Sequence, residues 1–116
     1  MNYLAVSTVV LDSPIYASGI SGFDAFSFGT PCVVQTGELL IQRYTSVLYD
    51  AMDIPEMKTT NKNEYVKQTV KIGTDLDYRE EISRLIRERR HLIFEDESVV
   101  KEWERFLETA VEQAGA

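Results

Sequence analysis

The chain has 116 residues, 44% of them hydrophobic, and a formal net charge of −7. This length and composition suffice for one domain with a modest core. The acidic balance argues against non-specific binding to nucleic acid or to anionic membranes, because both need clustered positive charge. No apolar run approaches the roughly 18 residues of a membrane span. We expect a cytoplasmic protein, because the N-terminus lacks signal-peptide features and the single cysteine, Cys32, cannot form an internal disulfide.

The first 35 residues predict a strand, a loop of small residues, a helix and a second strand. An apolar run predicts a buried strand over Thr8–Asp12. A short helix is predicted over Gly22–Phe28, ended by Gly29, and a second strand over Cys32–Val34. This order is that of a βαβ unit, in which the natural ligand position is the loop at the helix N-terminus.

Apolar residues at helical spacing dominate the rest of the chain. They predict four helices, over Glu38–Met52, Lys62–Ile72, Asp75–Arg90 and Ser98–Ala114. A short edge strand is expected over Met57–Thr60. Asn61 and Glu64 form a capping-box pattern at the start of the second of these helices, and Gly73 is expected to end it.

Each of these helices has an apolar face that we expect to point inward. The four faces comprise Leu40, Tyr44, Val47, Leu48 and Ala51; Tyr65, Val66, Thr69 and Val70; Tyr78, Ile82, Leu85 and Ile86; and Val99, Trp103, Phe106, Leu107, Ala110 and Ala114. Glu80 and Arg84 are placed for an ion pair one helical turn apart.

The predicted fold class is α/β, with a Rossmann-like parallel sheet of few strands followed by a helical tail. We expect residues 1–60 to form the βαβα part with the ligand loop, and residues 61–116 to form helices that pack on it within one domain. So few apolar parallel strands leave exposed edges and one uncovered face. We therefore expect the chain to be part of a larger doubly wound domain, or to dimerise.

The loop before the first helix is the main candidate site. It lacks the G-x-G-x-x-G fingerprint of dinucleotide-binding folds and the Gly-Lys-Ser/Thr of a P-loop. What remains is a helix N-terminus with free N–H groups, the Ser21 hydroxyl, and Gly19 and Gly22, which permit close approach. Two interpretations stay open, a phosphate site and a plain tight turn into a helix.

The other polar candidates also have two interpretations each. Asp24 either completes a capping box with Ser21 or binds a ribose. Arg43, the only base within residues 1–57, either faces a phosphate or pairs with a nearby acid. His91 is explained by a surface position at a helix C-terminus, and Cys32 by burial in a strand. With one histidine and one cysteine, neither a metal site nor a Ser-His-Asp or Cys-His site is expected.

Residues 11–43 resemble the nucleotide-sugar-binding segment of the O-linked N-acetylglucosamine transferase and SPINDLY-like family. Their sequence is LDSPIYASGISGFDAFSFGTPCVVQTGELLIQR, where the family has T-T-x-x-D-x-L-W-x-G-x-P-V-V-T followed by G-E-x-x-x-S-R. The likeness continues over residues 52–88, which contain the family's isoleucine-proline-glutamate step, its E-Y helix and its "gTD" turn. It covers nearly the whole chain.

The resemblance implies a glycosyltransferase-B fold, with this chain as the end of its C-terminal domain. In the family, two threonines at the helix N-terminus bind the diphosphate, and the aspartate three residues later holds the ribose. Carried over, Ile20 and Ser21 take the threonine positions, flanked by Gly19 and Gly22, and Asp24 takes the ribose position. Because Ile20 has no hydroxyl, only its backbone N–H could serve a phosphate. Gly19 sits where the animal enzymes carry a histidine.

The implied activity is transfer of a sugar, N-acetylglucosamine or another hexose, from a nucleoside-diphosphate sugar to protein. A UDP-sugar is the expected donor, and no metal or other cofactor is expected. Expected partners are the nucleotide sugar, an acceptor protein, and either the missing N-terminal part of the enzyme or a second copy of the chain. Catalytic residues are not identified, and the chain alone is expected to be inactive. The alternative is a non-catalytic α/β interaction module that has lost transferase activity.

Overall fold

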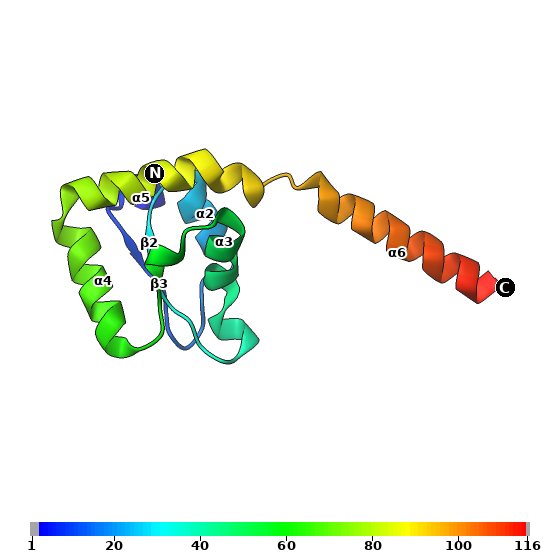
Figure 1. Ribbon diagram of the computed structural model, residues 1–116, viewed down its shortest axis with the longest axis horizontal. Helices are drawn as coiled ribbons and strands as arrows, with labels where there is room; N and C mark the ends of the chain where they lie inside the picture. The colour runs from blue at the N-terminus through cyan, green and yellow to red at the C-terminus, as the bar shows by residue number, and fades with distance from the viewer. Residues whose placement is uncertain (1–2, 116) are drawn as a thin grey trace.

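The computed structural model of the chain describes residues 3–115 (Figure 1). Its centre is a parallel sheet of order β1-β2-β3, with β1 at Val10–Leu11, β2 at Cys32–Gln35 and β3 at Lys58–Thr59. β1 pairs with the first half of β2 and β3 with its second half. The predicted α/β class with a short parallel sheet is therefore confirmed.

Helices surround this sheet. The α-helices are α1 (Tyr3–Val6), α2 (Ile20–Ser27), α3 (Tyr44–Met52), α4 (Lys62–Thr74), α5 (Leu76–Arg89) and α6 (Glu97–Gly115), and 3₁₀ turns span Leu40–Gln42, Pro55–Met57 and Arg90–Leu92. α4 lies on one side of β2 and the α2–α3 pair on the other, while α5 crosses one end of both layers (Figure 1). Both faces of the central strand are thus covered, although one uncovered face was expected.

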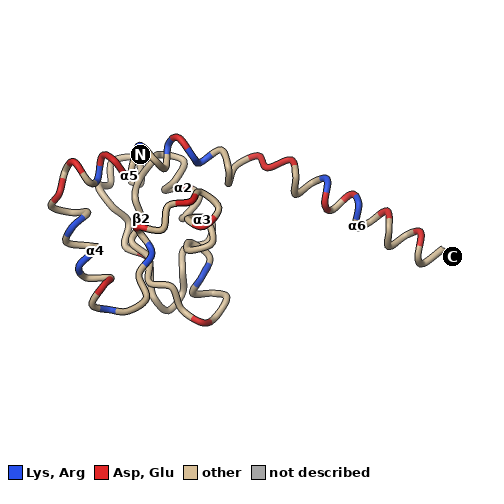
Figure 2. The backbone as a smooth tube through the Cα atoms, viewed as in Figure 1, with Lys and Arg blue, Asp and Glu red and all other residues tan. Residues whose placement is uncertain are grey.

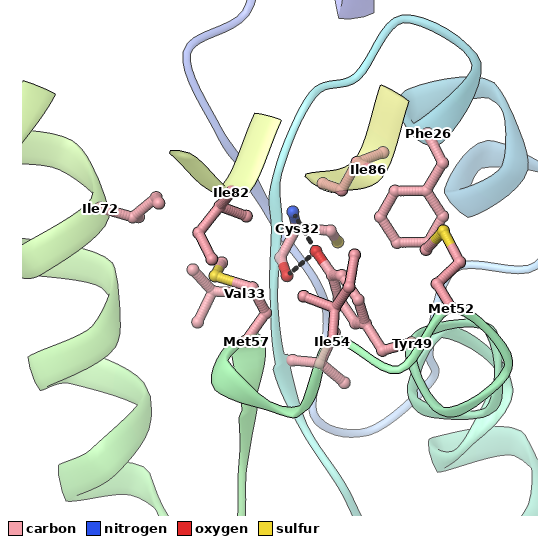
Figure 3. Close-up of a cluster of buried hydrophobic side chains, with 11 residues drawn as sticks. Phe26, Cys32, Val33, Tyr49, Met52, Ile54, Met57, Ile72, Ile82 and Ile86 are labelled. Atoms are coloured by element: carbon pink, nitrogen blue, oxygen red, sulfur yellow. Dashed lines mark hydrogen bonds between the residues drawn. The ribbon is translucent and has the colours of Figure 1, made fainter. Parts of the chain in front are cut away.

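The buried core gathers around β2 (Figure 3). Its members are Phe26, Cys32, Val33, Val34, Tyr49, Met52, Ile54, Met57, Ile72, Ile82 and Ile86. Successive β2 side chains alternate, so Val33 lies on the Ile72 side and Cys32 on the side of Phe26 and Met52. One strand therefore supplies apolar surface to both layers of helices.

Tyr49, on α3, is hydrogen-bonded to the backbone of this central strand. Its hydroxyl accepts from the Cys32 N–H and donates to the Cys32 carbonyl, each at 2.8 Å, and Tyr49 is fully buried (Figure 3). β3 pairs with β2 only from Val34 onward, so it does not pair with Cys32. The phenol therefore takes the place of a strand neighbour and satisfies two buried backbone groups.

The helix predicted over Glu38–Met52 is not continuous. A 3₁₀ turn covers Leu40–Gln42, and α3 begins only at Tyr44. The carbonyl of Ile41 accepts from the Ala17 N–H at 2.8 Å, so this carbonyl is engaged by the preceding loop instead of an α-helical partner. A contact with the loop overrides the local helical pattern.

The buried face predicted for this helix is wrong except at Leu48, which is half-buried and packs against the core. Val47 and Leu40 are exposed, whereas Thr45, Ser46, Tyr49 and Met52 are buried. The buried polar residues are tolerated because each hydroxyl has a partner: Thr45 bonds to the Ser18 carbonyl, Ser46 to Thr36 and Tyr49 to Cys32. These hydrogen bonds, together with burial of Met52 and of the Tyr49 ring, orient this helix.

The next two helices match the prediction in part. The Asn61 side chain caps α4 by accepting from the Glu64 N–H at 3.0 Å, as predicted. However, α4 continues through Gly73 to Thr74, and the valines of its predicted inward face are exposed. The predicted face of α5 is confirmed for its buried Ile82 and Ile86 and half-buried Tyr78 and Leu85. Arg84 pairs with Glu88 at 2.9 Å instead of the predicted Glu80.

α6 projects away from the rest of the molecule (Figure 1). All of its described residues are exposed, including the predicted apolar stripe, with Trp103 and Phe106 each 60% exposed. The expectation that the last helix packs on the domain is therefore not met. Five acidic and two basic residues are spread along its length (Figure 2). Within residues 3–115, no helix is both long and apolar enough to cross a membrane.

We expect Tyr49→Phe to lower the free energy of unfolding by about 2–4 kcal/mol, because it leaves the buried Cys32 N–H and carbonyl unpaired. Urea unfolding followed by circular dichroism measures this loss. Tyr44→Phe, on the same helix, is the matched control, since the Tyr44 hydroxyl has no partner among the described residues. Equal midpoints for the two variants would contradict the role assigned to the Tyr49 hydroxyl.

Candidate functional site

The candidate site lies where the chain leaves β1 and enters α2, at the carboxyl end of the sheet. This edge is the ordinary ligand position in open α/β sheets. Gly19 is the N-cap of α2, and the helix begins at Ile20, two residues before the predicted start. Ser21 is therefore inside the first turn, and no side chain caps the helix. The capping box expected for Ser21 and Asp24 is wrong.

In α2 the backbone N–H groups of Ile20 and Ser21 have no acceptor within the described part of the chain, and neither does that of the N-cap Gly19. The Gly22 N–H is engaged by the Gly19 carbonyl at 3.1 Å. Ile20 is 81% exposed, and Ser21 and Asp24 are also exposed. The start of α2 thus presents two free donors and a hydroxyl to solvent, together with the positive end of the helix dipole.

The preceding loop is fixed by buried side chains. Asp12 is 2% exposed, and its Oδ1 accepts from the Ser13 N–H at 3.1 Å and from the N–H and hydroxyl of Ser18 at 2.7 Å each. The Tyr65 hydroxyl donates to the Asp12 carbonyl at 2.8 Å, and Thr45 donates to the Ser18 carbonyl at 3.0 Å. α3 and α4 are therefore both tied to the loop. Asp12 Oδ2 is buried without a partner among the described residues.

Beside this helix end lies an open apolar groove. It is lined by Gly19, Ile20, Phe23, Leu40, Tyr44, Val47 and Leu48. Most of the residues that were predicted to face the core from the helix after β2 instead line this groove. No charged residue lies between Asp12 and Asp24, and Figure 2 shows charges spread along α4, α5 and α6.

The structure does not pair Arg43 with an acid. Arg43 is exposed at the N-cap of α3, and its side chain has no ion-pair partner among residues 3–115. Its backbone N–H donates to the Leu40 carbonyl at 3.0 Å. The guanidinium is thus an uncommitted cation, and a role towards phosphate stays a prediction.

Other reactive side chains do not form a site. Cys32 is buried, and desolvation, reinforced by the nearby Asp12 charge, raises the pKa of its thiol far above the ordinary value. His91 is exposed, with Nδ1 2.9 Å from the Glu88 carbonyl at the end of α5. The described residues include no group of three or more histidine, cysteine or acidic side chains placed to hold a metal.

Sequence reasoning missed the residues that hold the loop. Asp12 appeared only as the polar end of a strand, although a buried acid there is a usable signal for a loop anchor. Thr45 lies off the apolar stripe of its segment, and nothing local marks it as buried. Tyr65 was expected to be inward, but its bond to a residue 53 positions earlier has no local signature.

Residues 4–100 match the model of glycosyl transferase family 41. The chain belongs to this family. Over 74 residues it is 38% identical to a UDP-N-acetylglucosamine–peptide N-acetylglucosaminyltransferase of Caenorhabditis elegans, a match covering 63% of this chain and 6% of that relative. The predicted family resemblance is therefore confirmed.

A solved structure shows where this family 41 chain fits. It matches a mutant O-GlcNAc transferase of Thermobaculum terrenum with a TM-score of 0.79 at 22% identity. The match covers 94% of this chain and 22% of that one. The chain therefore has the fold of one part of that glycosyltransferase-B structure, and it spans a small fraction of both proteins.

We expect the native Cys32 thiol to resist a chromogenic disulfide reagent at pH 8.5 and to react fully in urea. Burial raises its pKa, so above roughly pH 8.5 the unfolded thiol ionises first, and stability falls as the pH rises. Ser21→Cys is the control, because position 21 is exposed. Native Cys32 reacting as fast as the thiol of that variant would contradict the burial.

Proposed function

We propose that the chain forms the donor-binding part of a glycosyltransferase that moves a sugar from a nucleoside-diphosphate sugar to a protein. The observation that carries this proposal is the exposed N-terminus of α2, with its two free N–H groups, at the position that the sequence resemblance assigns to the donor diphosphate. UDP-N-acetylglucosamine is the first donor to test, because the name of the Caenorhabditis elegans relative contains it.

Each residue at the helix end has an assigned role. The diphosphate accepts from the N–H groups of Ile20 and Ser21 and from the Ser21 hydroxyl, and Gly19 leaves the space beside them open. Gly22 is buried with its N–H bonded to the Gly19 carbonyl, so we assign it no direct contact with the ligand. Asp24 lies one turn further along α2, exposed, and binds the ribose hydroxyls. Arg43 is a candidate second contact to phosphate.

The reaction is direct displacement at the anomeric carbon. An acceptor hydroxyl oxygen forms the new bond to this carbon and loses its proton to a base, while the bond to the diphosphate breaks and its electron pair leaves with the nucleotide. The start of α2 stabilises the departing diphosphate. We assign the base and the acceptor contacts to other parts of a larger enzyme, because the chain spans 22% of the solved relative.

Titration of the ¹⁵N-labelled chain with UDP, UDP-N-acetylglucosamine, GDP-fucose and inorganic pyrophosphate tests the proposal. We expect shifts in the amide signals of Ile20 and Ser21 with each ligand. Asp24→Ala should weaken UDP binding about tenfold by removing the ribose contact, worth roughly 1.4 kcal/mol. Pyrophosphate has no ribose, so its binding should not weaken. Asp77→Ala, an exposed acid in the first turn of α5, is the control.

Two results would count against this proposal. No shift at Ile20 or Ser21 with any of the four ligands would remove the donor site from this helix end. An equal loss of UDP affinity in the Asp24 and Asp77 variants would show that the loss is not specific to the start of α2 and would remove the ribose role.

A second candidate function is a non-catalytic interaction module that associates with another copy of itself. The exposed apolar stripe of α6, with Trp103 and Phe106 in edge-to-face contact at 5.7 Å, favours it. Light scattering should then show a dimer that Trp103→Glu dissociates. A monomer at all concentrations, together with UDP binding, supports the donor-binding function alone.

A further inference from the structure

Ser18 is the residue directly before the N-cap of α2, and all of its polar groups are held by two buried side chains. Its N–H and hydroxyl both donate to Asp12 Oδ1 at 2.7 Å. Its carbonyl accepts from the Thr45 hydroxyl at 3.0 Å. Asp12 follows β1 and is 2% exposed, while Thr45 belongs to α3 and is fully buried. The peptide entering α2 is therefore fixed from two separate elements.

These contacts of Ser18 with Asp12 and Thr45, called the clamp below, set the direction in which the chain enters α2. The free N–H groups of Ile20 and Ser21 follow Ser18 by two and three residues. Gly19 lies between Ser18 and Ile20. It has φ −87° and ψ −101°, and a Cβ placed on it would meet nothing within 4 Å. Gly19 has no side chain to restrain it, and its carbonyl accepts only from Gly22 within α2, so Ser18 is the last residue before the donors that is held by other elements.

We propose that the clamp of Asp12, Ser18 and Thr45 positions the Ile20 and Ser21 N–H groups for the donor diphosphate, with Thr45 as the principal positioning residue. The inference rests on the proposed donor site. A preordered pair of donors avoids the entropy cost of fixing the loop when the ligand binds. Without its hydroxyl, Thr45 leaves the Ser18 carbonyl unpaired, and the backbone before the helix gains freedom.

The test compares three variants at positions 45 and 59. Thr45→Val keeps the shape and removes the hydroxyl, and Thr45→Ser keeps the hydroxyl. Thr59→Val is the matched control, because Thr59 is also buried and donates to a backbone carbonyl, that of Val34 at 2.8 Å, away from the loop. Thermal unfolding records the stability of each variant. ¹⁵N relaxation gives the order parameters of residues 19–21, and titration gives the Kd for UDP and pyrophosphate.

We expect Thr45→Val to lower the order parameters of residues 19–21 and to raise both Kd values about fivefold, the equivalent of one hydrogen bond of ~1 kcal/mol. Thr45→Ser should restore the order parameters and the two Kd values. Thr59→Val should lose comparable stability but leave the order parameters and the two Kd values unchanged. If Thr45→Val does not fold, Ser18→Ala removes only the hydroxyl bond to Asp12 and is compared in the same way.

Unchanged order parameters in Thr45→Val, or an equal loss in Thr59→Val, would overturn the inference. Lower order parameters of residues 19–21 in Thr45→Val, with unaltered affinity for UDP and pyrophosphate, would also overturn it. If the unaltered chain binds neither ligand, the proposed function fails, and with it the ligand role of the clamp. The order parameters then still decide whether Thr45 orders the start of α2, so the two failures are distinguishable.

Discussion

The bond between the Tyr49 hydroxyl and the Cys32 backbone is the constraint on which the arrangement depends. β3 is too short to pair with the first half of β2, and one phenol satisfies the two peptide groups that it leaves. This contact fixes the rotation of α3. Thr45 and Ser46 lie four and three residues before Tyr49, on the same face, so they are turned towards the loop and the end of β2. The geometry of the helix start thus follows from a contact in the core.

The same face of α3 explains why polar residues are buried next to an apolar groove. Turning Thr45, Ser46 and Tyr49 inward leaves Tyr44 and Val47 outside, where they line the groove beside α2. The hydrogen bonds of three buried hydroxyls offset the loss of apolar burial on the opposite face. The groove and the position of the loop before α2 therefore both follow from the rotation of α3 about its axis.

Local signals in the sequence were enough to place most elements and to identify the family. Apolar runs predicted β1 and β2, although β1 is limited to Val10–Leu11 and Leu11 is exposed rather than buried. Gly29 predicted the end of α2, and Asn61 the cap of α4. The motif around Asp24 indicated glycosyl transferase family 41. The rotation of α3 and its late start were not predictable, because they depend on pairs such as Ala17 with Ile41 and Thr45 with Ser18, which are distant in sequence. The candidate site residues could be named from the motif, whereas the residues that hold the loop before them could not.

The register of the sheet has a consequence for the depth of the site. Leu11, the last residue of β1, is opposite Val33, whereas Thr59, the last of β3, is opposite Gln35. The two outer strands therefore end at different heights along β2, separated by roughly 7 Å at about 3.3 Å per residue. The chain enters the candidate site from the end of β1, the strand that ends earlier along β2, and there the Asp12 carboxylate and Ala17 are buried. Two more residues in β1 would bring its end level with that of β3 and move the start of α2 outward, so the length of β1 decides how far this helix end is recessed.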